Sequence, residues 1–364
     1  MNLARLVGVV SLLALAGCSQ GTPATAPPTS LPSAPASSAP PSSAPASPAP
    51  ARFAAGDVRI ALVRQLSSGD YFEQWLAGAQ AEAKALNVRL EVSSGDGNND
   101  KQALNLEQAV TAGADAIIVD HGFAQTVQPA IKKAVAAKVP LVAFDVDPGA
   151  AEAVALTQDD HRIAEQALGA LKADTGGTGE VVYVHVAGFA PLDRRDETWR
   201  QFKKDNPGIK QVAQIGVVNN STASAVADQA KAALQAHPGV KAIFAPYDEF
   251  AKGAALAVKE LGLGDRVKIY GADVSTADIA VMTEPGSPWV ATSATDPANV
   301  GRVAVRAAAL LVAGSPVEHA LTVPPALITQ KGLRDAGITS VEQLTRAFPE
   351  LSTPDVARVP WTAS

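Results

Sequence analysis

Carboxylates, one arginine and aromatic side chains recur in this sequence close to the ends of short apolar runs that are typical of β-strands. The candidate residues are Tyr71, Phe72, Asp145, Asp147, Arg195, Tyr247 and Asp273. Carboxylate oxygens accept paired hydrogen bonds from vicinal hydroxyls, and an arginine donates in a rigid fork. Aromatic faces can cover the apolar C–H surface of a sugar ring. The combination favours a site for a small polyhydroxylated molecule.

Each of these aspartates, taken alone, is typical of a helix N-cap or a turn.

The elements that would bring these residues together alternate between strand and helix from Asp57 onward. The expected strands cover residues 58–63, 88–92, 116–119, 139–144, 181–186, 212–218, 242–245 and 267–270. The expected helices cover residues 71–86, 101–112, 126–137, 161–171, 194–204, 224–235 and 250–261.

This alternation predicts an α/β protein made of right-handed βαβ units with parallel sheets. Two lobes of about five strands each fit the chain length better than one large sheet. Ligands of such sheets bind beyond the carboxyl ends of the strands. Because the candidate residues follow strands, the sequence predicts that they share one site.

The overall composition excludes several classes of function. The 364 residues include 30 Lys and Arg against 36 Asp and Glu, a formal charge of −6, so a nucleic-acid binder is not expected. A single cysteine excludes a disulfide framework and a cysteine-rich metal site. The five histidines lack metal-ligand spacing, although Asp120-His121 at a strand end could border a cleft. We expect neither a metal nor a cofactor.

The N-terminal segment is typical of an export signal. Residues 6–17 form an apolar run that is too short to span ~30 Å of hydrocarbon. The run ends in Leu15-Ala16-Gly17-Cys18, which resembles a bacterial lipobox and implies cleavage after residue 17 and acylation of Cys18. Residues 18–56 are rich in Pro, Ala and Ser and are expected to form a stalk. We expect an exported protein, lipid-anchored in the periplasm or on the outer face of the cytoplasmic membrane.

The body of the chain resembles the type I periplasmic sugar-binding proteins of ABC transporters, the ribose-binding branch in particular. The resemblance covers roughly residues 58–330. It rests on Tyr71-Phe72, Gly78-Ala79-Gln80, Gly113-Ala114-Asp115-Ala116-Ile117-Ile118, Val139-Pro140-Leu141-Val142-Ala143-Phe144-Asp145, Arg195 with Trp199, His237-Pro238, Ala242-Ile243-Phe244-Ala245, Asp248-Glu249 and Gly271-Ala272-Asp273. It implies two Rossmann-like lobes with a ligand cleft between them. Lobe one would comprise residues 57–157 and 296–324, lobe two residues 158–295 and 325–330, followed by a tail over 331–364.

Position by position, the resemblance also implies roles. These are ring stacking for Tyr71 and Phe72, hydroxyl binding for Asp145 and Asp273, the second-lobe arginine for Arg195, and a hinge-side polar contact for Thr295. Two departures argue against ribose itself. The ribose binder has Asp-Arg where this chain has Asp145-Val146, with Asp147 beyond, and it has Asn where this chain has Tyr247.

The sequence therefore predicts a monomeric binding protein, not an enzyme, that captures a neutral monosaccharide-like or polyol solute and presents it to an ABC permease. Neutrality is expected because Asp145, Asp147 and Asp273 face a single assigned cation. The alternative is enzymatic. Asp145-Val146-Asp147 resembles the nucleophile motif of haloacid-dehalogenase-type phosphatases, in which one aspartate attacks phosphorus and the next acts as acid and base.

Overall fold

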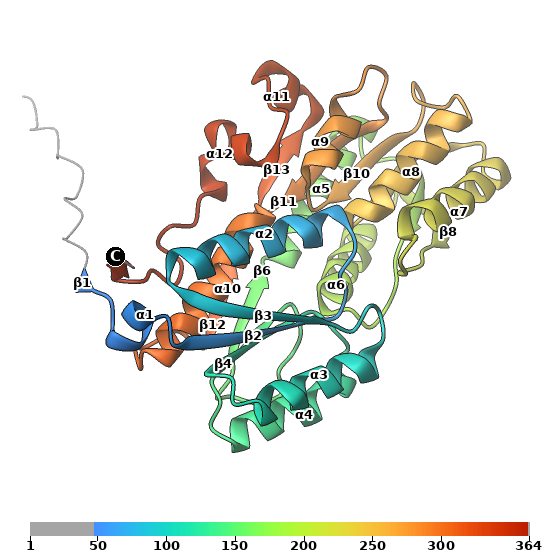
Figure 1. Ribbon diagram of the computed structural model, residues 1–364. Coiled ribbons are helices and arrows are strands. Elements are labelled where there is room, and N and C mark those ends of the chain that lie inside the picture. The colour runs from blue at the N-terminus through green and yellow to red at the C-terminus, as the bar shows by residue number, and fades with distance from the viewer. Residues whose placement is uncertain (1–46, 363–364) are drawn as a thin grey trace, which may run out of the picture. The chain divides into compact units, whose positions relative to one another are not determined.

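The computed structural model describes residues 47–362. The predicted signal peptide, Cys18 and most of the predicted stalk lie outside the described residues. Two six-stranded sheets, each covered by helices on both faces, dominate the described part of the chain (Figure 1). The predicted α/β class with two lobes is confirmed. No helix among residues 47–362 combines the length and the apolar character that crossing a membrane requires.

Lobe one contains a parallel sheet. Its strand order is β12 (Ala320–Val323), β6 (Val154–Gln158), β5 (Leu141–Phe144), β4 (Ala116–Asp120), β2 (Val58–Arg64) and β3 (Val88–Ser94). Its helices are α2 (Asp70–Ala85) and α10 (Pro297–Val312) on one face, and α3 (Asn99–Thr111) and α4 (Ala124–Ala136) on the other. Because side chains alternate along a strand, Ile60 belongs to the α2–α10 core and Ala61 to the α3–α4 core.

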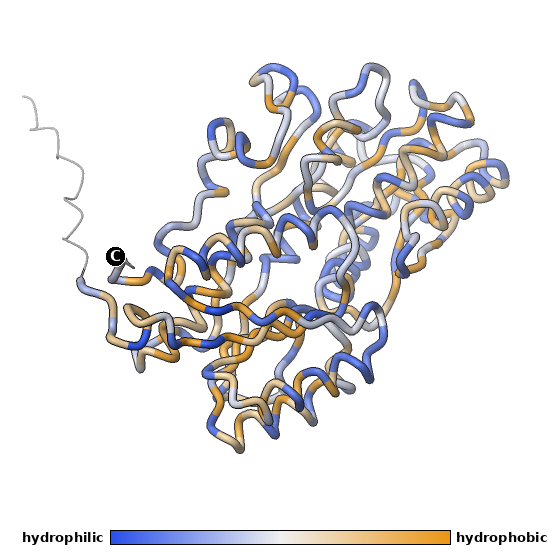
Figure 2. Tube along the Cα trace, in the orientation of Figure 1, coloured by the Kyte–Doolittle hydropathy of each residue, from blue (hydrophilic) through white to orange (hydrophobic). Residues whose placement is uncertain are grey.

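Lobe two repeats this layering. Its strand order is β13 (Ala326–Thr329), β11 (Trp289–Ala294), β10 (Lys268–Ala272), β9 (Val240–Ala245), β7 (Gly179–Val184) and β8 (Ile209–Ile215), with only the β13–β11 pair antiparallel. Its helices are α5 (Asp160–Thr175) and α6 (Ala190–Asp205) on one face, and α7 (Thr222–Ala236), α8 (Asp248–Glu260) and α9 (Thr276–Thr283) on the other. Figure 2 shows the hydrophobic stretches running through the strands, with hydrophilic residues outside.

The chain passes between the lobes three times: from β6 to α5, from β11 to α10, and from β12 to β13. The first two passages are bonded to each other. Thr295, which follows β11, donates its hydroxyl to Oε1 of Gln158 at the end of β6, over 2.5 Å. Both side chains are buried, so the two passages form one fixed connection beneath the space between the lobes.

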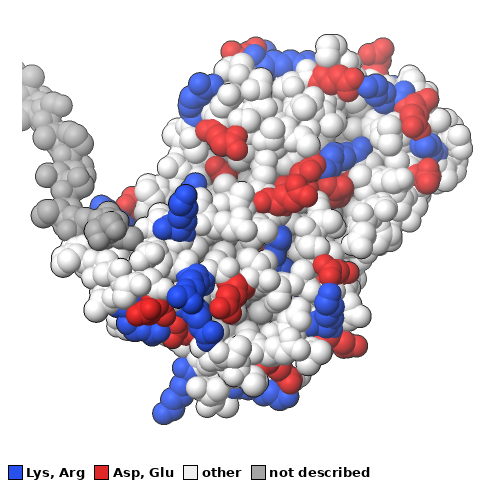
Figure 3. All heavy atoms as spheres, viewed as in Figure 1, with Lys and Arg blue, Asp and Glu red and all other residues white. Residues whose placement is uncertain are grey.

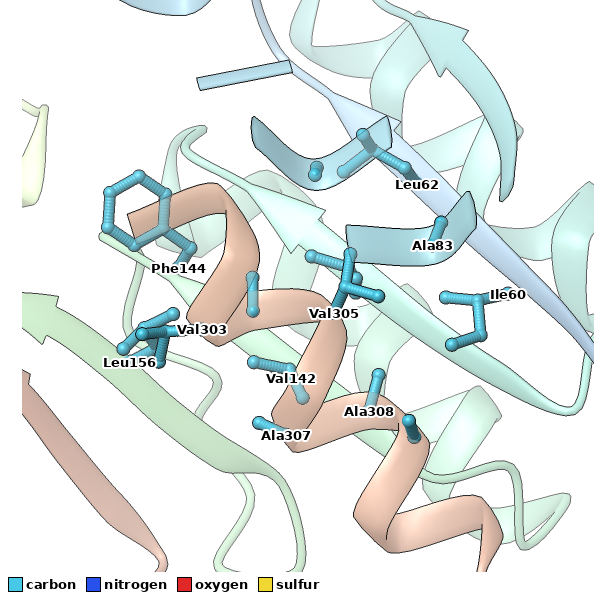
Figure 4. Packing of buried hydrophobic residues seen from close by; sticks show 14 of the residues in the cluster. Ile60, Leu62, Ala83, Val142, Phe144, Leu156, Val303, Val305, Ala307 and Ala308 are labelled. Atoms are coloured by element: carbon cyan, nitrogen blue, oxygen red, sulfur yellow. The ribbon is translucent and has the colours of Figure 1, made fainter. Parts of the chain in front are cut away.

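Helices α2 and α10 approach so closely that their contact requires glycine. A Cβ at Gly78 would lie 2.0 Å from the carbonyl oxygen of Ala298, and a Cβ at Gly301 would lie 2.1 Å from that of Trp75. The helices therefore meet backbone to backbone. Alanines of α10, such as Ala308, pack beside sheet residues in the core below, as Figure 4 shows. This close packing requires small residues where α2 and α10 face each other.

The two ends of the described chain meet on lobe one. Strand β1 (Ser47–Pro48) pairs in parallel with β14 (Trp361–Thr362), and Figure 1 shows the C-terminus beside it. Phe53, in the short helix α1 (Ala51–Ala55), is buried against Trp361 with ring centroids 5.3 Å apart. The structure thus corrects the predicted stalk boundary at residue 56. Residues 47–56 join the folded body because Phe53 gives them a large apolar side chain to bury.

The C-terminal tail is packed along both lobes. It contains α11 (Gln330–Asp335), α12 (Leu344–Ala347) and the 3-10 segments η1 (Val341–Gln343) and η2 (Pro349–Leu351). Leu333 and Leu344 belong to the core of lobe two, whereas Trp361 belongs to that of lobe one. On the face shown in Figure 3, acidic and basic side chains are interspersed and are not gathered by sign.

Candidate functional site

A cavity lies between the lobes, at the carboxyl ends of the strands of both sheets. Its lining comprises Leu66, Tyr71, Phe72, His121, Gln158, Phe189, Pro191, Leu192, Arg195, Val218, Tyr247 and Asp273. Five residues predicted from the sequence are among them, namely Tyr71, Phe72, Arg195, Tyr247 and Asp273. The structure does not place Asp145, Asp147 or Thr295 in this lining.

Three residues at strand ends hold a left-handed backbone that non-glycine residues rarely adopt. The φ angles are 59° at His121, 51° at Asp145 and 68° at Asp273. Each backbone N–H nevertheless donates to the neighbouring strand, to the carbonyls of Phe144 at 2.9 Å, Leu156 at 3.0 Å and Ser293 at 3.0 Å. These bonds offset the local strain and fix the three residues where the sheets meet the cavity.

The polar part of the cavity is organised by Arg195. Its Nη1 and Nη2 donate to the two carboxylate oxygens of Asp273 at 2.9 and 3.0 Å. Its Nε donates to Asp160 at 2.8 Å, and Nη1 also donates to the carbonyl of Pro246 at 2.8 Å. Arg195 is only 2% exposed. Burial opposes its charge, but the charges of Asp273 and Asp160 raise the pKa of Arg195 on balance. The guanidinium is therefore fixed and charged.

Asp145 joins the lobes instead of lining the cavity. One carboxylate oxygen accepts from Arg194 of lobe two at 2.8 Å, and the other accepts from Gln158 at 3.1 Å. Arg194 also donates through Nε to Asp160 at 2.8 Å. Burial, together with the charge of Asp160, raises the pKa of Asp145 to about 6. From the sequence, only the second arginine of the Arg194-Arg195 pair was expected at the site, whereas both form ion pairs in the structure.

Asp147 lies away from this cluster, which differs from the sequence prediction. Its side chain is exposed, accepts from Gln128 at 3.2 Å, and caps the turn by accepting from the backbone N–H of Gly149 at 3.0 Å. The residue thus fulfils the turn role that the sequence also allowed. Within residues 47–362, no group of three or more His, Cys, Asp or Glu side chains is arranged to hold a metal ion.

The aromatic side of the cavity comes from both lobes. Tyr71 and Phe72 of α2 meet edge to face, with centroids 5.6 Å apart. The Tyr71 hydroxyl is buried and has no hydrogen-bond partner among the described residues. Burial, followed by the charges of Asp273 and Asp145, raises the pKa of Tyr71, so its hydroxyl stays protonated. Tyr247 of lobe two, whose pKa burial also raises, lines the cavity too.

Apolar side chains that the sequence analysis did not single out line the rest of the cavity. They are Leu66, Phe189, Pro191, Leu192 and Val218. They come from loops after β2, β7 and β8, or from the first turn of α6. Their position after strands could have indicated them, but in the sequence an apolar residue that lines a cavity cannot be told from one in the core. One polar residue, Gln158, was also missed, because strand β6 was not predicted.

The lobes are in contact around the cavity. Lys252 of α8 donates to Asp70 at the start of α2 over 2.5 Å, and Gln74 of α2 donates to the hydroxyl of Thr276 in α9 over 2.9 Å. Phe123 of lobe one packs on Phe189 of lobe two, with centroids 4.7 Å apart. Together with the Arg194–Asp145 pair, these contacts hold the lobes around the cavity. A molecule bound there can touch both lobes at once.

Comparison with known proteins identifies the arrangement. Residues 60–316 match the model of the periplasmic binding protein domain. The D-ribose/D-allose-binding protein of Pseudomonas aeruginosa is 30% identical over 274 residues, covering 72% of this chain and 84% of that protein. The ribose import binding protein of Escherichia coli is 27% identical, covering 75% of this chain and 90% of that protein.

Solved structures agree. The 5-methylthioribose transporter solute-binding protein of Thermotoga lettingae, solved with 5-methylthioribose, is 42% identical with a TM-score of 0.81, over 83% of this chain and 96% of that one. A solute-binding protein of Agrobacterium vitis with bound allitol is 26% identical with a TM-score of 0.71, over 79% of this chain and 98% of that one. None of these proteins supports the phosphatase alternative. The chain belongs to the periplasmic binding protein domain family.

Proposed function

We propose that this protein is the solute-binding subunit of an ABC transporter, and that it captures a neutral sugar in the interlobe cavity and presents it to the permease. The observation that carries the proposal is the pairing of two features in one cavity. Lobe two supplies the fixed Arg195–Asp273 pair, and lobe one supplies the buried, unpartnered hydroxyl of Tyr71. Unsatisfied buried polar atoms are costly, and a hydroxylated ligand would satisfy them.

The division of the cavity supports a more specific ligand, a pentose that carries an apolar substituent. Arg195, Asp273, Gln158 and His121 can bond ring hydroxyls, whereas Leu66 and the other apolar lining residues offer no polar partner. The Thermotoga lettingae relative binds such a molecule, 5-methylthioribose. Tyr247, a departure from the ribose-binding pattern, lines the cavity and agrees with a ligand other than ribose.

Binding by hinge closure follows from how the lining is divided. Tyr71 and His121 belong to lobe one and Arg195 and Asp273 to lobe two, so a ligand bonds all four only when the lobes meet. The ligand therefore favours the closed form by its contacts with both lobes. A permease that fits the closed form would read closure as occupancy. We propose that the protein does this as a monomer and releases its ligand chemically unchanged.

A titration tests the function. Thermal unfolding and calorimetry would be followed with 5-methylthioribose, D-ribose, D-allose and allitol, with ribose 5-phosphate as the anionic control. A ligand at 100 times its Kd adds about 2.7 kcal/mol of stability. We expect this for 5-methylthioribose, a weaker gain for D-ribose, none for the phosphate, and loss of the gain in Arg195→Ala. Mass spectrometry should recover the ligand unaltered. If no sugar or polyol stabilised the protein, the assignment would be wrong.

We also propose that Cys18 is acylated and anchors the exported protein to the cell envelope. The Leu15-Ala16-Gly17-Cys18 sequence and the uncharged, proline-rich segment after it support this. Metabolic labelling with a fatty acid and fractionation would test it. The wild-type chain should be labelled and sediment with membranes, and Cys18→Ser should be unlabelled. Labelling that persists in Cys18→Ser would contradict the proposal.

A further inference from the structure

His121, which lines the cavity, is held in place by a hydrogen bond to Asp120 and by contacts with two aromatic rings. Its Nδ1 lies 2.6 Å from Oδ1 of Asp120, whose other oxygen accepts from Nε of Arg64 at 3.0 Å. Arg64 and Asp120 are both buried. The imidazole also stands edge-on to the rings of Phe72, at 5.1 Å, and Phe144, at 5.0 Å. The ring is therefore fixed both by a charged chain and by packing.

His121 lines the cavity, and its second ring nitrogen is not the one that contacts Asp120. Nε2 of His121 makes no hydrogen bond within the described part of the chain, and Oδ2 of Asp145 lies 3.9 Å away, beyond bonding distance. Nδ1 carries its proton toward Asp120, because a carboxylate at 2.6 Å only accepts. Nε2 is thus the atom that can change, either an acceptor in the neutral ring or a donor in the imidazolium.

The charges around the cavity decide between these forms. Two bonded groups of buried charges flank His121, which we call together the buried cluster. One is Asp120 with Arg64, and the other is Asp145, Asp160 and Asp273 with Arg194 and Arg195. Four carboxylates and three arginines give the cluster a net charge of −1, and an imidazolium at His121 makes it neutral. A buried net charge is strongly unfavourable, so the cluster favours the protonated ring.

We propose that His121 is a ligand-contact residue of lobe one, and that its imidazolium donates from Nε2 to a hydroxyl oxygen of the bound sugar. The proposal deepens the proposed function and rests on it. Asp120 and Arg64 are then positioning residues, because they fix the ring without touching the ligand. The ligand must offer an acceptor oxygen at this point, which a deoxy analogue would lack.

This role couples binding to protons. The groups that face or influence His121 are Asp120 on β4, Asp145 after β5, Arg64 on β2, Tyr71 on α2, and Asp273 on lobe two with its partner Arg195. Burial lowers the pKa of His121, but the hydrogen bond and charge of Asp120, followed by the charges of Asp145 and Asp273, raise it on balance. A ligand that accepts from Nε2 raises this pKa further, so binding above the free pKa takes up protons.

The test combines one variant with a measurement on the wild type. Calorimetry with 5-methylthioribose in two buffers of different ionisation enthalpy, from pH 7 to 10, gives the protons taken up on binding. His121→Asn is the variant, because asparagine tolerates the left-handed backbone. His319→Asn is the matched control, since His319 is exposed and remote from the cavity lining. Nitrogen NMR of the wild type reports the protonation of His121 directly.

We expect affinity at pH 7 to fall about tenfold or more in His121→Asn and to stay unchanged in His319→Asn. Wild-type affinity should weaken at high pH with proton uptake, whereas His121→Asn should show neither effect. Wild-type binding without proton uptake, together with an imidazole that NMR shows to be neutral at pH 7, would overturn the proposal even if His121→Asn did not fold. If no sugar bound the wild type, the proposed function would fail, and this proposal with it.

Discussion

Replacing Arg194 by glutamine tests how much the bond between Arg194 and Asp145 contributes to the closure of the two lobes. Arg194 donates to Asp160 of α5 within lobe two, and this contact persists whether the lobes are together or apart. Its bond to Asp145, at 2.8 Å, joins lobe two to lobe one and is broken when the lobes separate. The substitution therefore acts on the closed form alone. If the free protein is mainly open, the whole loss appears as a higher Kd.

The magnitude follows from the nature of that bond. A hydrogen bond between charged groups contributes about 1.5–3 kcal/mol, and the Arg194 side chain is 28% exposed, which lowers the expected loss to about 1–2 kcal/mol. Since 1.4 kcal/mol is tenfold in Kd, we expect a weakening of roughly 5- to 30-fold at pH 8. Because the pKa of Asp145 is about 6, the carboxyl is largely protonated at pH 5, and the difference should shrink there.

Calorimetry at both pH values, with small-angle scattering on free and saturated protein, measures the effect. Arg162→Gln is the matched control, because Arg162 is exposed on α5 and faces only Glu165 of the same helix, at 3.8 Å. We expect the control to bind like the wild type. Equal affinity of Arg194→Gln and wild type at pH 8, or a radius of gyration that does not change on binding, would refute the closure reasoning.

Four further substitutions test the stability of the fold. Gly301→Ala should lower the free energy of unfolding in urea by more than 2 kcal/mol, because its methyl would overlap the α2 backbone. Gly169→Ala is the control: a Cβ there meets nothing within 4 Å, so the free energy of unfolding should rise by about 0.5–1 kcal/mol. Equal effects of the two substitutions would contradict the role given to the α2–α10 contact. Trp361→Ala should cost about 3 kcal/mol by uncovering Phe53, and an unchanged midpoint would show that the tail is not part of lobe one. Asp278→Asn should add about 2 kcal/mol above pH 7. Burial raises the pKa of Asp278 to about 6, so the ionised carboxyl costs stability above pH 6 and the gain should vanish below pH 4; a gain independent of pH would be contradictory.

The sequence predicted a shared position for residues that follow strands with strong patterns. Tyr71, Arg195 and Asp273 lie after strands that buried apolar runs make plain, and the carboxyl-end rule then places them in one cleft. The rule was of no use where the strand itself was not predicted. Strand β6 has five residues, of which every second is only partly buried, so it lacks the continuous apolar run of its neighbours. Gln158, at the end of β6, was missed for this reason.

The roles of adjacent residues were harder to predict than their positions. Only Arg195 of the Arg194-Arg195 pair was assigned to the site, because the family resemblance places its second-lobe arginine at that position. The guanidinium arms are long enough for both to reach Asp160, and Arg194 then extends to Asp145. The spacing of residues in the sequence does not show how far these two side chains extend or which carboxylates they contact. The same holds for Asp147, where the Asp-x-Asp spacing suggested a shared role but the turn directs the second carboxyl to Gln128.

These pairings change the reason for expecting a neutral ligand. The sequence argument rested on a surplus of carboxylates that would repel an anion. In the structure Arg194 pairs with Asp145, Arg195 pairs with Asp273, and Asp147 lies apart from the cavity, so repulsion between unpaired charges no longer supports the expectation. A neutral ligand is still expected, because the buried cluster has no net charge when His121 is protonated. A charged ligand of either sign would then add a buried charge with no counter-ion. Ribose 5-phosphate and a 5-amino pentose should therefore both bind more weakly than 5-methylthioribose, whereas the surplus argument alone would predict a gain for the amine.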